Sequence, residues 1–306
     1  MRETSLTAEE VVAHTSLPSL PAVAVLILDM TSNADAGPKE IVQVVQQDQV
    51  LSSRILRVVN SSFYDLSKPC ASIAAAMAHL GSRTINSLAL SFGLVDISRQ
   101  ADGGLDLTGY WRRCVHSAAA ARRISLLTGT GDPEQCLLTG LSQDIGMLAL
   151  HASLDAVYGR VVAKTRGDHS RLPEAEEEAF GFNHARIGSE LAGRWRLPAY
   201  LADPIRHHHD AQMTAVGDRF LAAAVIMANH VASAIDKPDE DALRPLCSTA
   251  SKLLGISPHQ VKPLILESAV DASNLAGLLE VEIGAQPALI RAILARESVR
   301  AYSPRR

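Results

Sequence analysis

Cysteine and aromatic residues are scarce in this sequence, with four cysteines and 4% aromatics among 306 residues. The cysteines are scattered and form no CxxC pair, which argues against a thiolate zinc site and a disulfide framework. The N-terminal segment MRETSLTAEE lacks the apolar region of a signal peptide. The most apolar stretch, residues 220–235, is too short and too polar to cross a bilayer. We therefore expect a cytoplasmic protein that does not contact a membrane.

Positive charge is not in excess either. Lys and Arg number 29 against 33 Asp and Glu, which gives a net charge of -4, and no third of the chain is basic. Binding to nucleic acid depends on clustered cations that neutralise phosphates, so this balance predicts no nucleic-acid partner. A Walker-type loop, a GxSxG elbow and a GxGxxG loop are all absent.

Apolar residues recur at helical spacing along nearly the whole chain, and no stretch alternates like a β-strand. The sequence therefore predicts an all-α protein, built as a two-lobe helical bundle. The turn formers at 101–104 give the best internal boundary. We expect an N-terminal segment over 1–14, a first helical lobe over 15–100, a second lobe over 101–240 and a helical extension over 241–306. The expected helices span 22–30, 38–47, 50–60, 72–80, 83–98, 107–127, 133–150, 153–166, 173–180, 184–195, 198–209 and 218–235, with about four more between 241 and 298.

Several polar residues fall on the apolar faces of these helices. Asp144 lies in the apolar stripe of the expected helix 133–150, and His184 begins the stripe of helix 184–195. A carboxylate or imidazole that points into a core must be paired or bound to something. A single such residue is most often a hydrogen-bonded core residue, but five on five helices can converge on one polar pocket. The five positions are His116, Asp144, His184, His208 with its neighbour His209, and Asn229.

The order of these residues resembles that of the HD metal-dependent phosphohydrolase superfamily. Four longer stretches resemble one branch of this superfamily, the HDOD domain, which is an output domain of bacterial signalling proteins. They are LPSLPAVAVLILDM, IVQVVQQDQVLSSRILRVVNSSFY, IAAAMAHLGSRTINSLAL and EEEAFGFNHARIGSELAGRWRLP. The resemblance covers residues 15–235. It implies that the second lobe is HD-like and that His116, Asp144, His184 and His208 line one pocket.

The sequence departs from the catalytic pattern of that superfamily at several positions. The His-Asp doublet is Gln143-Asp144, the later metal-binding aspartate falls at Asn229, and Met147 stands where a lysine often follows. No GYP motif follows the paired histidines, which argues against the branch that hydrolyses cyclic di-GMP. The resemblance therefore implies a degenerate pocket with no catalytic residue and no expected cofactor, formed by His116, Gln143, Asp144, His184, His208, His209 and Asn229. Most of the acidic run 174–180 is expected to form a solvated helix face, and Glu178 is the residue of this run expected to reach the pocket.

These observations predict a non-catalytic signalling or regulatory module that binds a protein partner or a small ligand, such as a nucleotide second messenger. The alternative is a metal-dependent phosphohydrolase acting on a nucleotide or cyclic dinucleotide, with Fe, Mn or Zn held by His116, Asp144, His184, His208 and His209. A third interpretation takes 38–60 as a DNA-reading helix pair that uses Arg54 and Arg57. We favour a core-forming pair there, because the surrounding third of the chain is acidic. The sequence does not indicate an oligomeric state.

Overall fold

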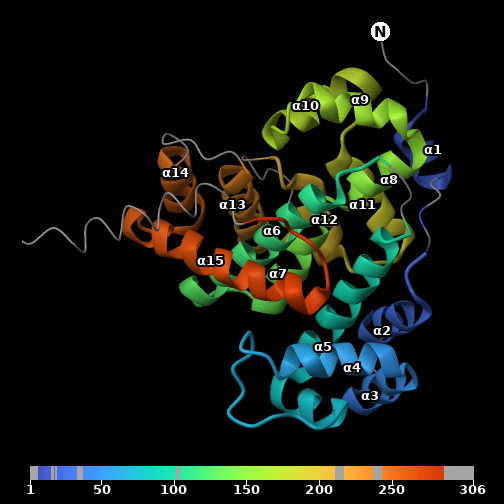
Figure 1. The fold of residues 1–306 in the computed structure, drawn as a ribbon, viewed down its shortest axis with the longest axis vertical. Helices are drawn as coiled ribbons and strands as arrows, with labels where there is room; N and C mark the ends of the chain where they lie inside the picture. Colours follow the sequence, from blue (N-terminus) through green and yellow to red (C-terminus); the bar gives the residue numbers. More distant parts are fainter. Residues whose placement is uncertain are drawn as a thin grey trace, which may run out of the picture.

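The computed structural model describes residues 6–14, 17, 19–32, 37–100, 104–210, 217–236 and 243–285, and every regular element in these ranges is a helix (Figure 1). This confirms the all-α fold class. The first part of the chain contains α1 (Ala8–His14), α2 (Ala22–Ser32), α3 (Pro38–Gln47), α4 (Gln49–Val59) and α5 (Ile73–Ser98). The later part contains α6 (Leu107–Thr128), α7 (Pro133–Ser142), α8 (Ile145–Leu154), α9 (Ala156–Lys164), the 3-10 helix η1 (His169–Arg171), α10 (Leu172–Phe180), α11 (His184–Arg194), α12 (Ala199–His207), α13 (Arg219–Asp236), α14 (Leu243–Leu254) and α15 (Pro258–Leu279).

Helices α2, α3 and α4 gather at one end of the molecule and pack against α5 (Figure 1). The Asp48 carboxylate accepts a hydrogen bond from the Leu51 amide at 2.9 Å and so fixes the start of α4. Gly81 has φ 79° inside α5, which kinks the helix where the sequence predicts a stop. The two helices expected over 72–98 are therefore two arms of one kinked element.

The sequence is wrong about residues 133–150, which form two helices rather than one. Helix α7 ends at Ser142 and α8 begins at Ile145, so that Gln143 and Asp144 lie in the turn between them. The break lets α8 approach the start of α11 closely. A Cβ atom on Gly146 would lie 2.0 Å from the His184 carbonyl oxygen, so only glycine fits there. Asp144 and His184 are thereby brought together.

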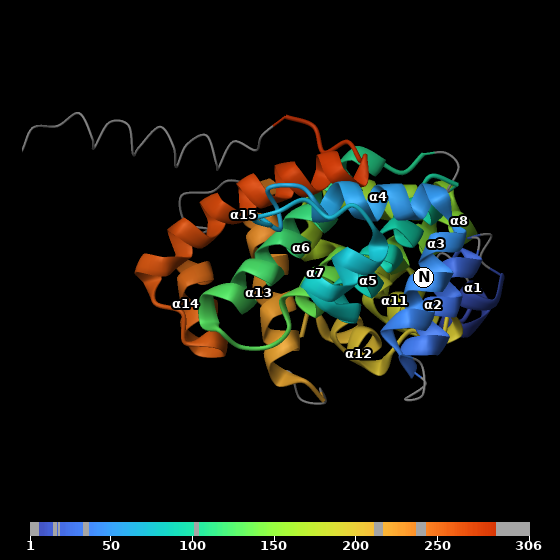
Figure 2. The same cartoon turned by 90° about the horizontal axis from the view of Figure 1, so that it is seen from below.

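Helices α13, α14 and α15 lie at the opposite end of the molecule from α1 to α3 (Figure 2). They form a separate apolar cluster with α6, which includes Ile124, Val231 and Leu264. Of the four helices expected in the tail, the structure describes α14 and α15, while residues 286–306 lie outside the described ranges.

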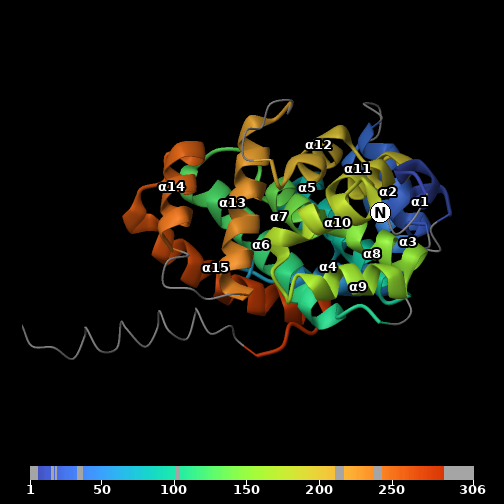
Figure 3. The same cartoon turned by 90° about the horizontal axis from the view of Figure 1, so that it is seen from above.

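The main apolar core is continuous from α1 to α12 and joins the two expected lobes. The predicted boundary falls on residues 101–103, which lie outside the described ranges, so the division into lobes stays a prediction. Helices α9 and α10 pack against each other beside α8 (Figure 3). Within the described ranges, no helix combines the length and apolar character needed to cross a membrane. All four cysteines are free.

Candidate functional site

Five polar side chains from separate segments between residues 144 and 209 meet in the interior. Their ligand atoms all lie within 4.8 Å of one another: Asp144, His169, His184, His208 and His209. Asp144 comes from the turn between α7 and α8, His184 from the first position of α11, and His208 from the end of α12. The sequence predicted four of these five residues, and His169 is the addition.

The Asp144 carboxylate stands at the centre of this cluster. Its Oδ1 atom faces the Nε2 atoms of His169 and His184 at 3.4 Å each, and that of His208 at 3.2 Å. The Nε2 atoms of His184 and His208 are 3.3 Å apart. The side chains of Asp144, His184 and His208 are fully buried, so no bulk water screens these contacts.

The imidazole rings of His184 and His208 are fixed from behind. The Nδ1 atom of His184 donates to the Glu176 carboxylate at 2.7 Å, and the Nδ1 atom of His208 donates to the Ile205 carbonyl at 2.7 Å. A neutral imidazole that donates from Nδ1 presents a lone pair at Nε2. In the neutral form of the two rings, which is the form that a metal ion binds, both lone pairs would point toward Asp144, the arrangement that outer partners produce around metal-binding histidines.

Glu176 is the acidic residue that reaches the site, and Glu178, the residue expected from the sequence, is exposed. One Glu176 oxygen accepts from both the backbone amide and the ring of His184, and the other accepts from the Tyr158 hydroxyl at 2.8 Å. Residue 176 is four positions from Leu172 and Phe180, both buried on the inner face of α10. Residue 178 is turned by about 200° from it, because each helical residue rotates by 100°.

The opposite side of the Asp144 carboxylate is occupied by Arg113, a residue of α6 that the sequence did not indicate as part of the site. Its Nε atom donates to Asp144 Oδ2 at 2.9 Å, and its terminal nitrogens donate to Asn229 Oδ1 and to the Ser233 hydroxyl. The Gln143 amide donates to Asp144 Oδ2 at 3.3 Å and to Asn229 Oδ1 at 3.2 Å. Of the two amides predicted to line the pocket, Asn229 is therefore a partner of the buried guanidinium, and Gln143 joins the two oxygens that accept from it.

His209 lies beside the cluster in a different role. Its Nδ1 atom accepts from the Asn229 amide at 3.3 Å, and its Nε2 atom is 3.0 Å from His184 Nε2. Because the Asn229 oxygen already accepts from Arg113 and Gln143, the Asn229 nitrogen is the atom that faces His209. This assigns the proton of His209 to Nε2, which leaves that nitrogen without a lone pair for a cation.

The structure corrects the expectation for His116, which is not among the five clustered residues. Its Nδ1 atom donates to the Arg112 carbonyl at 2.7 Å one turn earlier on α6. The helical face that meets the cluster carries Arg113 and Ser117, whose hydroxyl accepts from Gln143 at 3.1 Å. The His116 ring is therefore bonded to its own helix, and its ligand atoms are not among those that meet at Asp144.

The buried charges of the site balance one another. Burial acts to lower the pKa of His184, but Glu176 and Asp144 outweigh it and raise that pKa to about 9. Burial acts to raise the pKa of Asp144, but His169 and Arg113 hold it well below its usual range. Burial, with Arg113, lowers the pKa of His169 to about 3. At neutral pH, therefore, the protonated His184 and Arg113 oppose the carboxylates of Asp144 and Glu176.

Three buried atoms of the site have no hydrogen-bond partner: Gln143 Oε1, Asp144 Oδ1 and His169 Nε2. Unpaired buried polar atoms are costly, so a native site that retains them is usually completed by another species. Imidazole nitrogens with one carboxylate oxygen are the ligand types that suit Zn, Fe and Mn. The Asp144 Oδ1 side of the cluster therefore fits a divalent cation.

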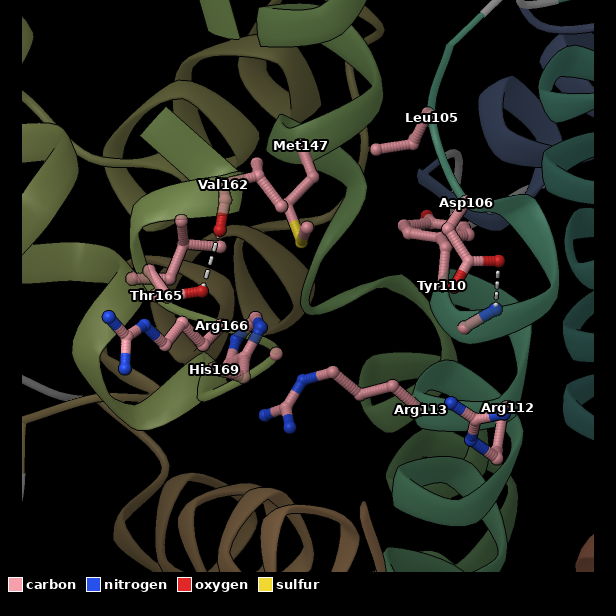
Figure 4. A pocket seen from close by; sticks show the side chains of 13 residues that line it. Leu105, Asp106, Tyr110, Arg112, Arg113, Met147, Val162, Thr165, Arg166 and His169 are labelled. Atoms are coloured by element: carbon pink, nitrogen blue, oxygen red, sulfur yellow. Dashed lines mark hydrogen bonds between the residues drawn. The ribbon is translucent and has the colours of Figure 1, made fainter. Parts of the chain in front are cut away.

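A cavity of 320 Å³ opens next to this cluster, between α6, α8 and α9 (Figure 4). Its walls are apolar at Leu105, Met147 and Val162, while Arg113 and His169 are the two cluster residues that line it. In Figure 4 the Arg113 side chain extends from α6 toward the His169 ring. The cavity thus touches Arg113 and one histidine of the cluster, His169.

His169 reaches the cluster from a tight turn after α9. Arg166 and Gly167 adopt left-handed backbone conformations, with φ of 54° and 78°, and the Asp168 amide donates to the Thr165 carbonyl at 3.0 Å. An L-residue at φ 54° is uncommon outside such turns. The turn reverses the chain directly before His169 and lines one side of the cavity.

The helix pair that resembles a DNA-reading motif is engaged within the protein. Arg54 of α4 contacts Asp96 at 3.0 Å, and its guanidinium lies 5.5 Å from the centre of the Phe92 ring. Arg57 contacts Glu280 at 2.7 Å. Both arginines thus face carboxylates of neighbouring segments, which favours the core-forming interpretation of 38–60.

A model of the HDOD domain matches residues 17–211. An uncharacterized protein of Treponema pallidum (strain Nichols) is 25% identical over 238 residues, which are 76% of this chain and 45% of that protein. The chain therefore spans less than half the length of this curated relative.

Solved structures share the fold. An HDOD domain protein of unknown function from Geobacter sulfurreducens has a TM-score of 0.71 at 24% identity, over 89% of this chain and 96% of that one. A candidate phosphohydrolase from Shewanella amazonensis SB2B has a TM-score of 0.70 at 24% identity, over 87% of this chain and 99% of that one. Since the family model covers well over half of the residues, the chain belongs to the HDOD domain family.

Proposed function

We propose that this chain is a cytoplasmic signalling module that binds an anionic small ligand and does not hydrolyse it. The observation that carries this proposal is the 320 Å³ cavity that ends on Arg113 and His169. Its volume is in the range typical of small-molecule sites, with apolar walls and a few polar groups. Arg112 and Arg166 also line it, and among the described residues Asp106 is the one acidic residue in the lining. This balance favours a ligand with an apolar body and a negative group, such as a nucleotide second messenger.

The absence of hydrolysis is supported by the partners of Asp144. A second metal ion on the side of Asp144 away from the histidines would use its Oδ2 atom as a ligand. Here Oδ2 is held by the Arg113 guanidinium, and the neutral amides of Gln143 and Asn229 complete that contact. Met147 lines the cavity with a thioether where the catalytic pattern has a cationic amine.

A metal-dependent phosphohydrolase is the second candidate, and the cluster of four histidines with Asp144 favours it. The residues that would hold a metal ion are Asp144, His169, His184 and His208. A bound divalent ion would supply Lewis acidity and lower the pKa of a water molecule. Arg113 would then face the same cavity as the substrate and could bind its phosphate.

Ligand binding is tested by calorimetry with cyclic di-GMP, cyclic di-AMP, cyclic AMP and GTP as probes. We expect one of these to bind in a 1:1 ratio to the wild type and to lose binding in Val162→Phe, which fills the cavity. Val50→Phe, at an exposed position of α4 in the other part of the molecule, is the matched control and keeps binding. Absence of binding by every probe, or equal binding by Val162→Phe, contradicts the ligand proposal.

Catalysis is tested separately by turnover of the same nucleotides and of simple phosphomonoesters and diesters. The protein is assayed after loading with Zn²⁺, Mn²⁺ or, without oxygen, Fe²⁺. We expect no turnover above that of Asp144→Asn. Turnover that disappears in Asp144→Asn makes the phosphohydrolase the leading function, whatever the calorimetry shows.

A further inference from the structure

The two oxygens of the Asp144 carboxylate face different surroundings. Oδ1 faces only imidazole nitrogens, those of His169, His184 and His208, and has no hydrogen-bond donor. Oδ2 faces only N–H donors, from Arg113 at 2.9 Å and from Gln143 at 3.3 Å. The carboxylate therefore separates a histidine side from a guanidinium side.

The guanidinium side is built like a small cation site. Three oxygen atoms surround the Arg113 head group: Asp144 Oδ2, Asn229 Oδ1 and the Ser233 hydroxyl at 3.1 Å. The Arg113 side chain is 4% exposed, so its charge depends on these partners rather than on water. Gln143 joins Asp144 to Asn229 through its amide group. The two departures from the catalytic pattern in this region, Gln143 and Asn229, thus contact the same arginine or its partners.

We propose that Arg113 takes the place of a metal ion on the Oδ2 side, so that the cluster holds one divalent cation, on the Oδ1 side, and not two. Arg113 is thus the residue that limits the cluster to one metal ion per chain. A guanidinium carries one positive charge permanently and supplies it at a fixed position. It offers only donors, so it can share Asp144 with a cation but cannot ligate one.

The spacing on the Oδ1 side fits one tetrahedral ion. Four ligands at about 2.05 Å from zinc lie about 3.3 Å from one another along the edges of the tetrahedron. The distances from Asp144 Oδ1 to the three imidazoles are 3.4, 3.4 and 3.2 Å, and the Nε2 atoms of His184 and His208 are 3.3 Å apart. Four of the six distances between these donors are therefore already at ligand spacing, and all donors of the cluster lie within 4.8 Å of one another. The sequence predicted no metal ion anywhere in the pocket. We keep that expectation for the Oδ2 side and place one ion on the Oδ1 side.

The experiment measures the zinc content of the 306-residue chain by equilibrium dialysis against Zn²⁺ and elemental analysis. We expect one equivalent per chain in the wild type. Gln143→His with Asn229→Asp supplies better ligands on the Oδ2 side, yet this double variant still binds one equivalent, because Arg113 remains there. Adding Arg113→Met to the double variant raises the content to two equivalents.

The control is Arg123→Met in the same double variant. It removes another carboxylate-paired arginine of α6, one that contacts Asp271 and Glu267, and it leaves the content at one. A wild type that binds no zinc or two equivalents overturns the proposal. A double variant that binds two equivalents with Arg113 in place overturns it as well, and so does a folded triple variant that stays at one.

A spectroscopic measurement on the wild type keeps the proposal testable if the triple variant does not fold. X-ray absorption of the zinc-loaded protein should show imidazole and oxygen ligands and no metal–metal vector. A metal–metal vector in the wild type overturns the proposal. Neither measurement uses turnover or nucleotide binding. The inference about Arg113 can therefore fail while the proposed function stands, and the proposed function can fail while the inference stands.

Discussion

Arg113 and Asp144 form a buried ion pair, with 2.9 Å between the guanidinium Nε and the carboxylate Oδ2. The side chains are 4% and 0% exposed. A pair of this kind is costly to break from one side, because the remaining charge stays buried without a partner. The pair also joins α6 to the turn between α7 and α8, the two elements that frame the cluster.

Asp144→Asn should lower the free energy of unfolding by about 3–5 kcal/mol, since it leaves Arg113 uncompensated. Urea denaturation of metal-free protein measures this. Arg83→Met is the control: it breaks the Arg83–Asp132 pair, in which the arginine side chain is 74% exposed, and should cost less than about 1 kcal/mol. Equal losses of unfolding free energy in the two variants would contradict the prediction that the buried Arg113–Asp144 pair is the costlier one to break.

The stability of the metal-free protein should depend on pH through His184. Its folded pKa, about 9, lies above the value of 6.5 for the free side chain, so its contribution is fully present below pH 6.5 and is lost as the pH rises through 9. The lowered pKa of His169 acts in the opposite sense below pH 6.5, where the unfolded chain takes up the proton. We expect a stability maximum near neutral pH, measured by denaturation across pH 5–10. In His184→Gln the alkaline decline should flatten, and an unchanged decline would contradict the assignment.

Gly146→Ala should disrupt the junction of α8 and α11. The added Cβ would lie 2.0 Å from the His184 carbonyl oxygen, which is backbone and cannot swing aside. We expect a loss of about 3 kcal/mol or more from overpacking, together with weaker zinc binding, because Asp144 and His184 move apart. Gly159→Ala, where a Cβ meets nothing within 4 Å, is the control and should leave both stability and binding near wild type.

Glu176→Gln should weaken zinc binding by about 10–100-fold, the range found when an outer partner of a metal-binding histidine is removed. This prediction rests on the proposed single cation site. Glu178→Gln, an exposed change on the same helix, should leave the affinity unchanged. Competition titration with a zinc chelator measures both variants at one pH. Similar affinities for the two variants would show that the Glu176–His184 contact does not support the ligand.

No specific binding to duplex DNA is expected at physiological salt. The net charge is -4, and Arg54 and Arg57 already contact Asp96 and Glu280. Mobility shift with a randomised duplex library measures this. A sequence-selective shift that disappears in Arg54→Ala with Arg57→Ala would make the prediction wrong.

The sequence predicts the parts of the site that carry a helical pattern. Asp144, His184 and His208 lie on apolar stripes, and the structure brings them together as expected. Glu176 carries the same signal, since it is four positions from Leu172 and Phe180 on the buried face of α10. Its neighbours in the acidic run obscured that signal.

Two site residues give weaker signals. His169 comes from a turn, where no periodicity reports which side chains point inward. Arg113 is three positions after Tyr110, on the buried face of α6, but the adjacent arginine made the pair resemble a solvated surface. At the break between α7 and α8, the backbone of Gly146 packs closely against that of His184. This is a contact between residues far apart in the sequence, so the helix propensity of residues 133–150 does not reveal it.

The turn at Arg166 and Gly167 has a consequence for the coordination shell of a bound ion. With His169 in place, four protein ligands would surround the ion and leave no position for water, as in structural zinc sites. Asp144, His184 and His208 each lie directly at the end of an α-helix, whereas His169 follows this strained turn, so the turn is the element whose rearrangement would open the shell. An ion with three protein ligands and an open position is the catalytic type. The conformation of five residues, 165–169, thus decides which type of metal centre this protein presents.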